Sequence, residues 1–300
     1  MSHTDEMPDM AEVILRGFQA RKGIGERPED ASENRDQKKI PLLEMFGPTI
    51  EGEGAVIGVQ TFFFRVAGCD YKCQMCDSLH AVLPEQFGPK AHYLTQSQLF
   101  EAFKTFVEAK KSNVRRLTLS GGNPCLYDFT EFLGLLRSWD PNWEIFVETQ
   151  GTFVPSWIVR ADHVTISPKG PGFGEKFEVE KYLYMAETLQ GLDISWNTKI
   201  VVFDVRDLEF AEDVYRRTTA EMGPLYNWYL SVGNHQTPSN IEKAQKASPE
   251  LVYDGYEKHV IDLLAQYRMI IEEVQQRPTL ESFIILPQMH VLLYGNKEKV

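Results

Sequence analysis

The chain has 300 residues with a formal net charge of −12 at pH 7, and 43% of its residues are hydrophobic and 12% aromatic. That length allows one large domain or two smaller ones, and that composition can build a full core. The acidic balance argues against non-specific nucleic-acid binding, which needs basic patches. The chain has no stretch of eighteen apolar residues, which argues against a membrane span.

Residues 1–39 differ in composition from the rest of the chain. Residues 13–15 (VIL) predict one or two helical turns, whereas residues 23–39 contain almost no apolar side chains. Such a segment cannot bury enough apolar surface to fold alone. The sequence therefore predicts a polar, flexible N-terminal extension over residues 1–39 and a single domain over residues 40–300.

Within that domain, strand-like and helix-like segments alternate. The predicted strands are residues 59–67, 114–120, 143–149, 163–167, 199–203, 228–232 and 283–286. The predicted helices are one that opens at the capping box of residues 95–98, followed by residues 129–136, 178–189, 208–218 and 259–275. Residues 233–256 form a polar insertion with no clear period.

Strands separated by helices of about ten to fifteen residues imply βαβ units and a parallel sheet. Polar and glycine-rich residues cluster just after strand ends, at Gly68, Gly121 and Ser167. In α/β barrels the reactive site lies at the C-terminal ends of the strands. We therefore expect an α/β fold, a full or partial barrel, with the functional site at its mouth.

Three cysteines lie in the loop that follows the first of these strands. Cys69, Cys73 and Cys76 form the pattern Cys-x3-Cys-x2-Cys. Three thiolates can hold three irons of a [4Fe–4S] cluster, whose usual complement is four cysteines. The fourth iron is then open to an exogenous ligand, as a protein needs in order to bind and cleave S-adenosylmethionine (SAM).

Two other uses of these cysteines remain open. A zinc site would need a fourth ligand, for which His80 is the nearest candidate, although zinc ligands more often come in two separated pairs. Disulfides are disfavoured because the N-terminus is polar and acidic and no secretory signal is evident. The reduced cysteines and the acidity predict a cytoplasmic protein, in which Cys125 is a small buried loop residue.

Two further segments follow strand ends and would share the rim with the cysteine loop. Gly121-Gly122-Asn123-Pro124 could approach a ligand closely and present its amide groups, here to the amino end of SAM. Lys169, in Ser167-Pro168-Lys169, could meet a carboxylate of SAM or of a substrate. The alternative explanations are a plain strand-to-helix turn for the first segment and a Pro turn with a solvated lysine for the second.

Arg65 and Ser78 flank the cysteine loop. Arg65 interrupts the apolar run FFFRVA, and a buried arginine without an anion is costly. Because arginine binds carboxylates with two parallel hydrogen bonds, we favour a substrate carboxylate over a structural salt bridge as its partner. Ser78 could cap a turn, or it could be an oxygen ligand for Mg²⁺.

Together, these segments resemble the 7-carboxy-7-deazaguanine synthase family of radical SAM enzymes. The resemblance rests on residues 44–54 (EMFGPTIEGEG), 64–78 (FRVAGCDYKCQMCDS), 120–124 (SGGNP), 148–151 (ETQG), 167–169 (SPK) and 286–297 (LPQMHVLLYGNK). The last of these is similar to the end of the Bacillus-type members. The resemblance covers roughly residues 40–300 apart from the polar insertion, and the cysteine motif alone indicates only the superfamily.

The resemblance implies a reaction and a set of cofactors. Such enzymes are lyases of the queuosine pathway that convert 6-carboxy-5,6,7,8-tetrahydropterin to 7-carboxy-7-deazaguanine with loss of ammonia. They abstract hydrogen from C6 and contract the ring, using SAM catalytically and Mg²⁺ to bind substrate. The resemblance also implies a modified, incomplete barrel, a homodimer, and an electron donor such as flavodoxin or ferredoxin.

Residue roles carried over from the family are expectations. The cluster ligands would be Cys69, Cys73 and Cys76, and Ser78 would bind Mg²⁺. The SAM contacts would be Met75, Cys76, Asp77, Gly122, Ser167, Pro168, Lys169, Ser231 and Asn234. The substrate contacts would be Ile50, Glu51, Gly52, Arg65, Ser120, Gln288 and His290.

Three features depart from the family pattern. Glu51 stands where glutamine is common, which puts a side-chain amide contact in doubt. The N-terminal extension and the polar insertion have no counterpart in the family pattern.

Two rival functions also remain: another radical SAM reaction, such as a glycyl-radical activase, and a zinc-stabilised binding protein.

Overall fold

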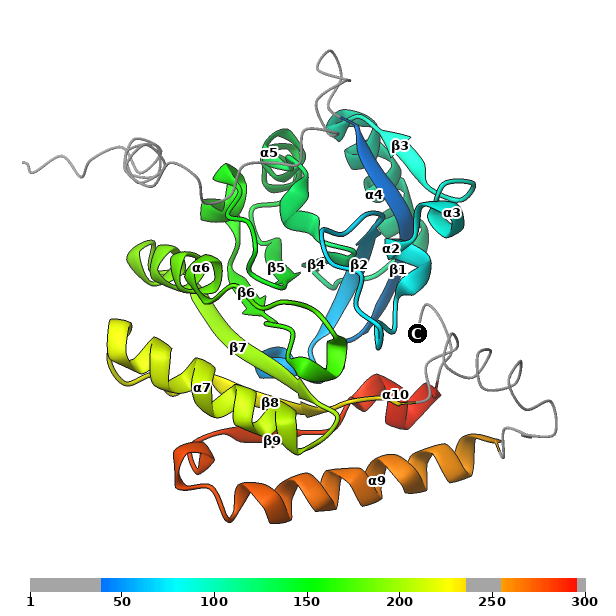
Figure 1. Ribbon diagram of the computed structural model, residues 1–300. Coiled ribbons are helices and arrows are strands. Elements are labelled where there is room, and N and C mark those ends of the chain that lie inside the picture. Colours follow the sequence, from blue (N-terminus) through cyan, green and yellow to red (C-terminus); the bar gives the residue numbers. More distant parts are fainter. Residues whose placement is uncertain (1–38, 236–254, 296–300) are drawn as a thin grey trace, which may run out of the picture.

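The computed structural model describes residues 39–235 and 255–295 (Figure 1). The helical turns expected at residues 13–15, the extension up to residue 38 and residues 236–254 of the insertion lie outside the described residues. In the described part, no helix is both long enough and apolar enough to cross a membrane.

A single curved sheet of nine strands organises the described residues, in the order β3-β1-β2-β4-β5-β6-β7-β8-β9. The strands are β1 (Ile40–Ile50), β2 (Gln60–Val66), β3 (His92–Leu94), β4 (Arg116–Gly121), β5 (Glu144–Thr149), β6 (His163–Ile166), β7 (Ser195–Val202), β8 (Trp228–Val232) and β9 (Ile284–Leu286). Neighbouring strands from β2 to β9 are parallel. The α/β fold and the incomplete barrel are confirmed, whereas the antiparallel pairing of β1 with β2 and β3 was not predicted.

The long helices cover the convex side of the sheet (Figure 1). They are α4 (Gln96–Lys110), α5 (Thr130–Trp139), α6 (Val179–Gly191), α7 (Val205–Met222) and α9 (Gly255–Val274), and the short ones are α2 (Leu79–Val82), α3 (Pro84–Phe87) and α10 (Met289–Tyr294). The predicted capping box opens α4, because the Thr95 hydroxyl accepts from the Gln98 amide at 3.3 Å and the Gln98 side chain accepts from the Thr95 amide at 3.0 Å.

Along a strand of the sheet, side chains face the hydrophobic core and the cavity in turn. In β2, Phe62 and Phe64 are fully buried against the helices, and the ring of Phe103 in α4 packs edge-on against both. Successive side chains of a strand point to opposite faces. Phe63 and Arg65 therefore face the concave side, where they line a cavity.

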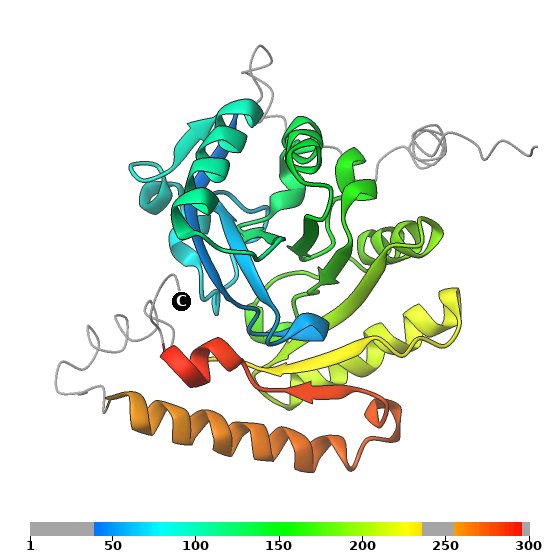
Figure 2. The same cartoon turned by 180° about the vertical axis from the view of Figure 1, so that it is seen from behind.

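The chain after β1 contacts the C-terminal segment. Met289 donates its amide to the Gly52 carbonyl at 2.9 Å. Gly52 has to be small, because a Cβ there would lie 2.0 Å from the imidazole of His290. Figure 2 shows α10 beside the loop that joins β1 to β2. Two segments far apart in sequence thus form one wall of the cavity.

Candidate functional site

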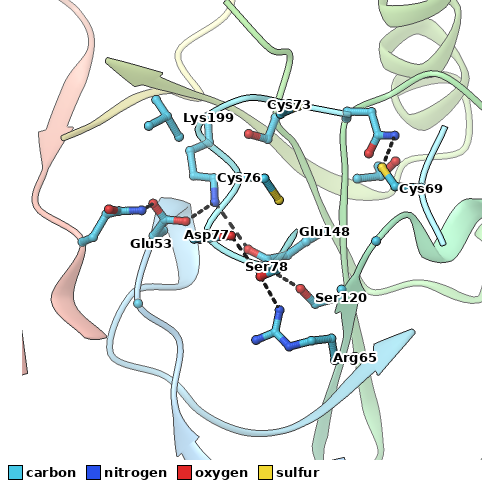
Figure 3. Close-up of a pocket in the computed structure, with 18 of the residues that line it drawn as sticks. Glu53, Arg65, Cys69, Cys73, Cys76, Asp77, Ser78, Ser120, Glu148 and Lys199 are labelled. Carbon is cyan, nitrogen blue, oxygen red and sulfur yellow. Dashed lines mark hydrogen bonds and ion pairs between the residues drawn. The ribbon is translucent and has the colours of Figure 1, made fainter. Parts of the chain in front are cut away.

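The cavity lies on the concave side of the sheet and has a volume of about 210 Å³ (Figure 3). Most of the residues singled out from the sequence line it. They are Ile50, Glu51, Gly52, Arg65, Cys69, Cys73, Met75, Cys76, Asp77, Ser78, Ser120, Gly122, Ser167, Lys169, Asn234, Gln288 and His290. Pro168 and Ser231 are buried but are not among the described residues that line the cavity.

Glycines hold the cysteine loop against the end of β4. A Cβ at Gly122 would lie 1.9 Å from the Gly68 carbonyl oxygen, so only glycine allows this approach. The Gly122 amide donates to the Val66 carbonyl, and the Asn123 amide donates to the Gly68 carbonyl, each at 2.9 Å. These two amides are used within the protein, which corrects the expectation that they would be presented to a ligand.

The three loop cysteines are free thiols that share the cavity. Burial raises the pKa of Cys69 to about 11 and the pKa values of Cys73 and Cys76 to about 12. These thiols hold their protons at neutral pH until a metal displaces them. Three thiols on one short loop beside a cavity fit a [4Fe–4S] cluster with one iron left for a ligand. Cys125, in contrast, is fully buried in the hydrophobic core.

The geometry does not favour a zinc site. Among the described residues, no three or more His, Cys, Asp or Glu side chains are placed to share one metal ion. The imidazole Nε2 of His80 instead lies 3.8 Å from the Glu44 carboxylate. His80 is therefore directed toward Glu44, and the described residues do not form the tetrahedral ligand set of a structural zinc ion.

Lys169 is half-buried at the rim. Its ammonium donates to the Ser167 hydroxyl at 3.0 Å and lies 4.9 Å from the centre of the Phe173 ring. Phe173 also packs with Cys73 in a small apolar cluster. Lys169 thus places a positive charge at the edge of the cysteine loop, where it can meet an anionic group.

Arg65 already forms a structural salt bridge with Glu44 within the protein, which corrects the expectation that a substrate carboxylate rather than a salt bridge would be its partner. Residues 44 and 65 are directly paired across β1 and β2, and the Arg65 Nε donates to the Glu44 carboxylate at 2.7 Å. Burial opposes ionisation of Glu44, but His80 and Arg65 outweigh it and lower its pKa to about 2. The Arg65 Nη1 donates to the Ser78 hydroxyl at 2.7 Å, and Ser78 donates to Asp77 at 2.9 Å.

A buried charged group that we did not single out from the sequence lines the same cavity as the cysteines (Figure 3). Lys199, on β7, donates to Glu53 at 2.5 Å and lies 3.5 Å from the Glu148 carboxylate. Glu148 also accepts from Ser120, and Glu53 accepts from Gln288, both at 2.7 Å. Burial lowers the pKa of Lys199, but Glu53 and Glu148 outweigh it, so the net shift is upward.

Glu51 lies beside this group and is 4% exposed. It accepts a hydrogen bond from the Thr118 hydroxyl, and among the described residues no cation forms an ion pair with it. Burial raises the pKa of Glu51 well above its ordinary value, and the nearby Glu148 carboxylate raises it further. The neutral carboxylic acid is favoured, and it has an O–H to donate as well as an oxygen that accepts.

Comparisons with known proteins agree with this geometry. A family model described as a 4Fe-4S single cluster domain matches residues 50–150. A 7-carboxy-7-deazaguanine synthase from Bacillus cereus is 34% identical over 263 residues, which cover 87% of this chain and 99% of the relative. The enzyme of the same name from Bacillus subtilis is 35% identical over 267 residues, with 88% and 99% covered. The crystal structure of QueE from Escherichia coli shares the fold, with a TM-score of 0.56 at 22% identity, covering 86% of this chain and 99% of that one.

Proposed function

The chain belongs to the 7-carboxy-7-deazaguanine synthase family, and we propose that its cavity converts 6-carboxy-5,6,7,8-tetrahydropterin to 7-carboxy-7-deazaguanine with loss of ammonia. It is a radical SAM enzyme of the queuosine pathway that uses a [4Fe–4S] cluster and SAM. The observation that carries the proposal is the meeting of three free thiols and a buried charged group in one cavity. The test is product formation, described at the end of the Discussion.

The residues near the cysteines suit SAM. When bound, the cluster and SAM supply a 5′-deoxyadenosyl radical. Lys169 would hold the SAM carboxylate, because its ammonium faces the cavity beside the cysteine loop. The amino group of SAM is cationic and needs acceptors. Since the Gly122 amide is already bonded to Val66, Gly122 would offer its carbonyl oxygen.

The remaining cavity wall suits a carboxylated pterin. Arg65 would bind the substrate carboxylate, and Ser120 and Glu148 would lie near the ring. The pyrimidine edge of a pterin carries N–H donors, which the Glu53 and Glu148 carboxylates can accept. Glu51 in its neutral form can donate as an amide does, so it can serve where relatives carry glutamine.

Four further features of the family are part of the proposal. The enzyme would receive its electron from a flavodoxin or ferredoxin, act as a homodimer and reside in the cytoplasm. Mg²⁺ would bind between the substrate and Ser78, because Mg²⁺ is usually held by one or two protein oxygens together with substrate and water. Ser78 is nearly buried at the edge of the cavity, next to Arg65 and Asp77.

Replacing Ser78 tests the magnesium site. Ser78→Ala is expected to weaken the dependence of turnover on Mg²⁺ and to lower turnover, with SAM binding little changed, because one oxygen ligand is lost. Ser78→Thr, which keeps the hydroxyl, is the matched control and should retain the dependence. A Mg²⁺ titration of Ser78→Ala that matches the wild type would assign Ser78 to positioning Arg65 alone.

Replacing Arg65 tests the carboxylate site. Arg65→Lys keeps a charge for Glu44 but loses the two-pronged contact, so the apparent KM for the carboxypterin should rise. Charged hydrogen bonds are worth roughly 1.5–3 kcal/mol, or about ten- to more than a hundredfold in binding. Cleavage of SAM without substrate should continue. Steady-state kinetics under anaerobic conditions, with substrate-free cleavage measured alongside, checks both.

Glu44→Gln is the control for Arg65, because it removes the ion pair and leaves the guanidinium intact. It should raise the KM less than Arg65→Lys does. If the two variants lose activity alike, both with and without substrate, then Arg65 supports the fold and the substrate carboxylate binds elsewhere.

A further inference from the structure

The amide side chain of Gln150 contacts the sulfur of Cys69, one of the three loop cysteines. Gln150 follows β5 and is 6% exposed. Its Nε2 is 3.5 Å from the Cys69 sulfur, within hydrogen-bonding distance of a sulfur acceptor, and it also donates to Asp70. The Tyr71 amide donates to the same sulfur at 3.4 Å. Of the three loop cysteines, only Cys69 accepts a side-chain hydrogen bond within the described part of the chain.

Asp70 fixes which end of the amide faces the sulfur. A carboxylate and a thiolate are both acceptors, so the NH₂ group must point at them and the amide oxygen must point away. Asp70 is itself held by the Asn123 side chain at 2.8 Å. Asn123 is oriented in turn by the Cys125 amide and the Thr149 hydroxyl, at 3.2 and 3.0 Å. Hydrogen bonds therefore lead from the buried end of β5 to Cys69.

We propose that Gln150, turned by Asp70, donates an N–H···S hydrogen bond to the Cys69 thiolate of the cluster and thereby raises the cluster's reduction potential. Reduction adds one electron, and the cluster sulfurs take up part of the added negative charge. A fixed N–H donor stabilises the more negative, reduced state, and hydrogen bonds to sulfur are among the factors that set such potentials. The inference rests on the proposed function, because it requires the cluster.

A redox titration of the holoenzyme tests the inference. Dithionite supplies one electron per cluster in the presence of mediators, and low-temperature EPR follows the reduced form. Gln150→Met keeps the length of the side chain but has no donor, so the equilibrium constant for reduction should fall about tenfold, or about 59 mV for one electron. Gln150→Glu replaces the donor with an oxygen and should lower the potential further.

Gln96→Met is the matched control. Gln96 is also a buried glutamine, but its side chain accepts from the Phe132 amide away from the cysteines, so the potential should stay at the wild-type value. Iron and sulfide contents of all variants report whether the cluster is retained. The order wild type above Gln150→Met above Gln150→Glu supports the inference.

Two results would overturn it: a potential unmoved in both Gln150 variants, or iron lost from them while the remaining clusters keep the wild-type potential. The second result would give Gln150 a role in retaining the cluster only. Neither result would touch the proposed function. A wild-type protein that binds no cluster would contradict both.

Discussion

Cys73→Ala is expected to abolish cleavage of SAM, and Cys69→Ala and Cys76→Ala should do the same. Each change removes one of the three thiolates that would bind the cluster, and a neighbouring side chain that only donates a hydrogen bond cannot replace it. Iron content and low-temperature EPR of the reduced protein measure the loss of the cluster, and 5′-deoxyadenosine formation measures the loss of activity.

Cys125→Ala is the matched control, because this cysteine is fully buried in the core and does not line the cavity. Its removal should leave the cluster signal and SAM cleavage in place. A cluster signal that persists in Cys73→Ala but vanishes in Cys125→Ala would overturn the assignment of the ligands.

Lys199→Met should destabilise the protein and abolish turnover of the carboxypterin. In the wild type the Glu53 carboxylate lies 2.5 Å from the Lys199 ammonium. The change leaves this carboxylate in a buried site without its cation. Breaking a buried pair by removing one partner costs about 3–5 kcal/mol, which lowers the Tm by on the order of 10 °C. Thermal unfolding followed by circular dichroism, together with the product assay, measures both effects.

The loss of stability in Lys199→Met should grow with pH. In the wild type, burial raises the pKa of Glu53 but Lys199 outweighs it, so the net shift is downward. That contribution to stability is fully present above the unfolded-state pKa, and it is lost only at lower pH, as the pH falls through the lowered folded-state pKa. Without Lys199 the buried carboxylate favours its neutral form, so the variant recovers part of its stability between pH 8 and pH 5.

Lys181→Met is the control for charge removal. Lys181, on α6, forms a surface pair with Glu178, the residue that precedes the helix, and such surface pairs contribute about 0–1 kcal/mol. Its Tm should stay close to that of the wild type at both pH values. If the Tm fell equally and independently of pH in Lys199→Met and Lys181→Met, then Lys199, Glu53 and Glu148 would not act as a stabilising ion-pair network.

Much of the fold could be predicted because its strands and helices have strong periodic patterns. The strand at residues 228–232 was predicted with the bounds that β8 has, and the capping box placed the start of α4. The strand β1 was missed because Pro41 and the Gly47-Pro48 pair are typical of turns. The structure accommodates them with irregular register against β2.

The same reasoning that identified Arg65 could have found part of the charged group. Glu148 lies within one predicted apolar strand and Lys199 is the first residue of another, and a charge that becomes buried in such a place needs a partner. What they pair with could not be read from the sequence, because the partners come from other strands and loops. Gln288 lies 235 positions from Glu53, and only the folded chain brings them together.

His80 and Arg65 show the limits of local reasoning. His80 is four residues from Cys76 and was a natural fourth ligand for zinc, yet the start of α2 turns it toward Glu44. The partner of Arg65 was equally hidden, because the pairing of residues 44 and 65 depends on the unpredicted antiparallel strand β1. Site residues on loops next to motifs were predictable, and partners across strands were not.

The most direct test of the central claim is an anaerobic assay of the reconstituted protein with 6-carboxy-5,6,7,8-tetrahydropterin, SAM, Mg²⁺ and dithionite. Liquid chromatography with mass spectrometry follows product, SAM and ammonia. We predict one 7-carboxy-7-deazaguanine and one ammonia for each pterin consumed, over many turnovers, with no matching loss of SAM. Cleavage of SAM to 5′-deoxyadenosine with the carboxypterin left unchanged would contradict the proposed function.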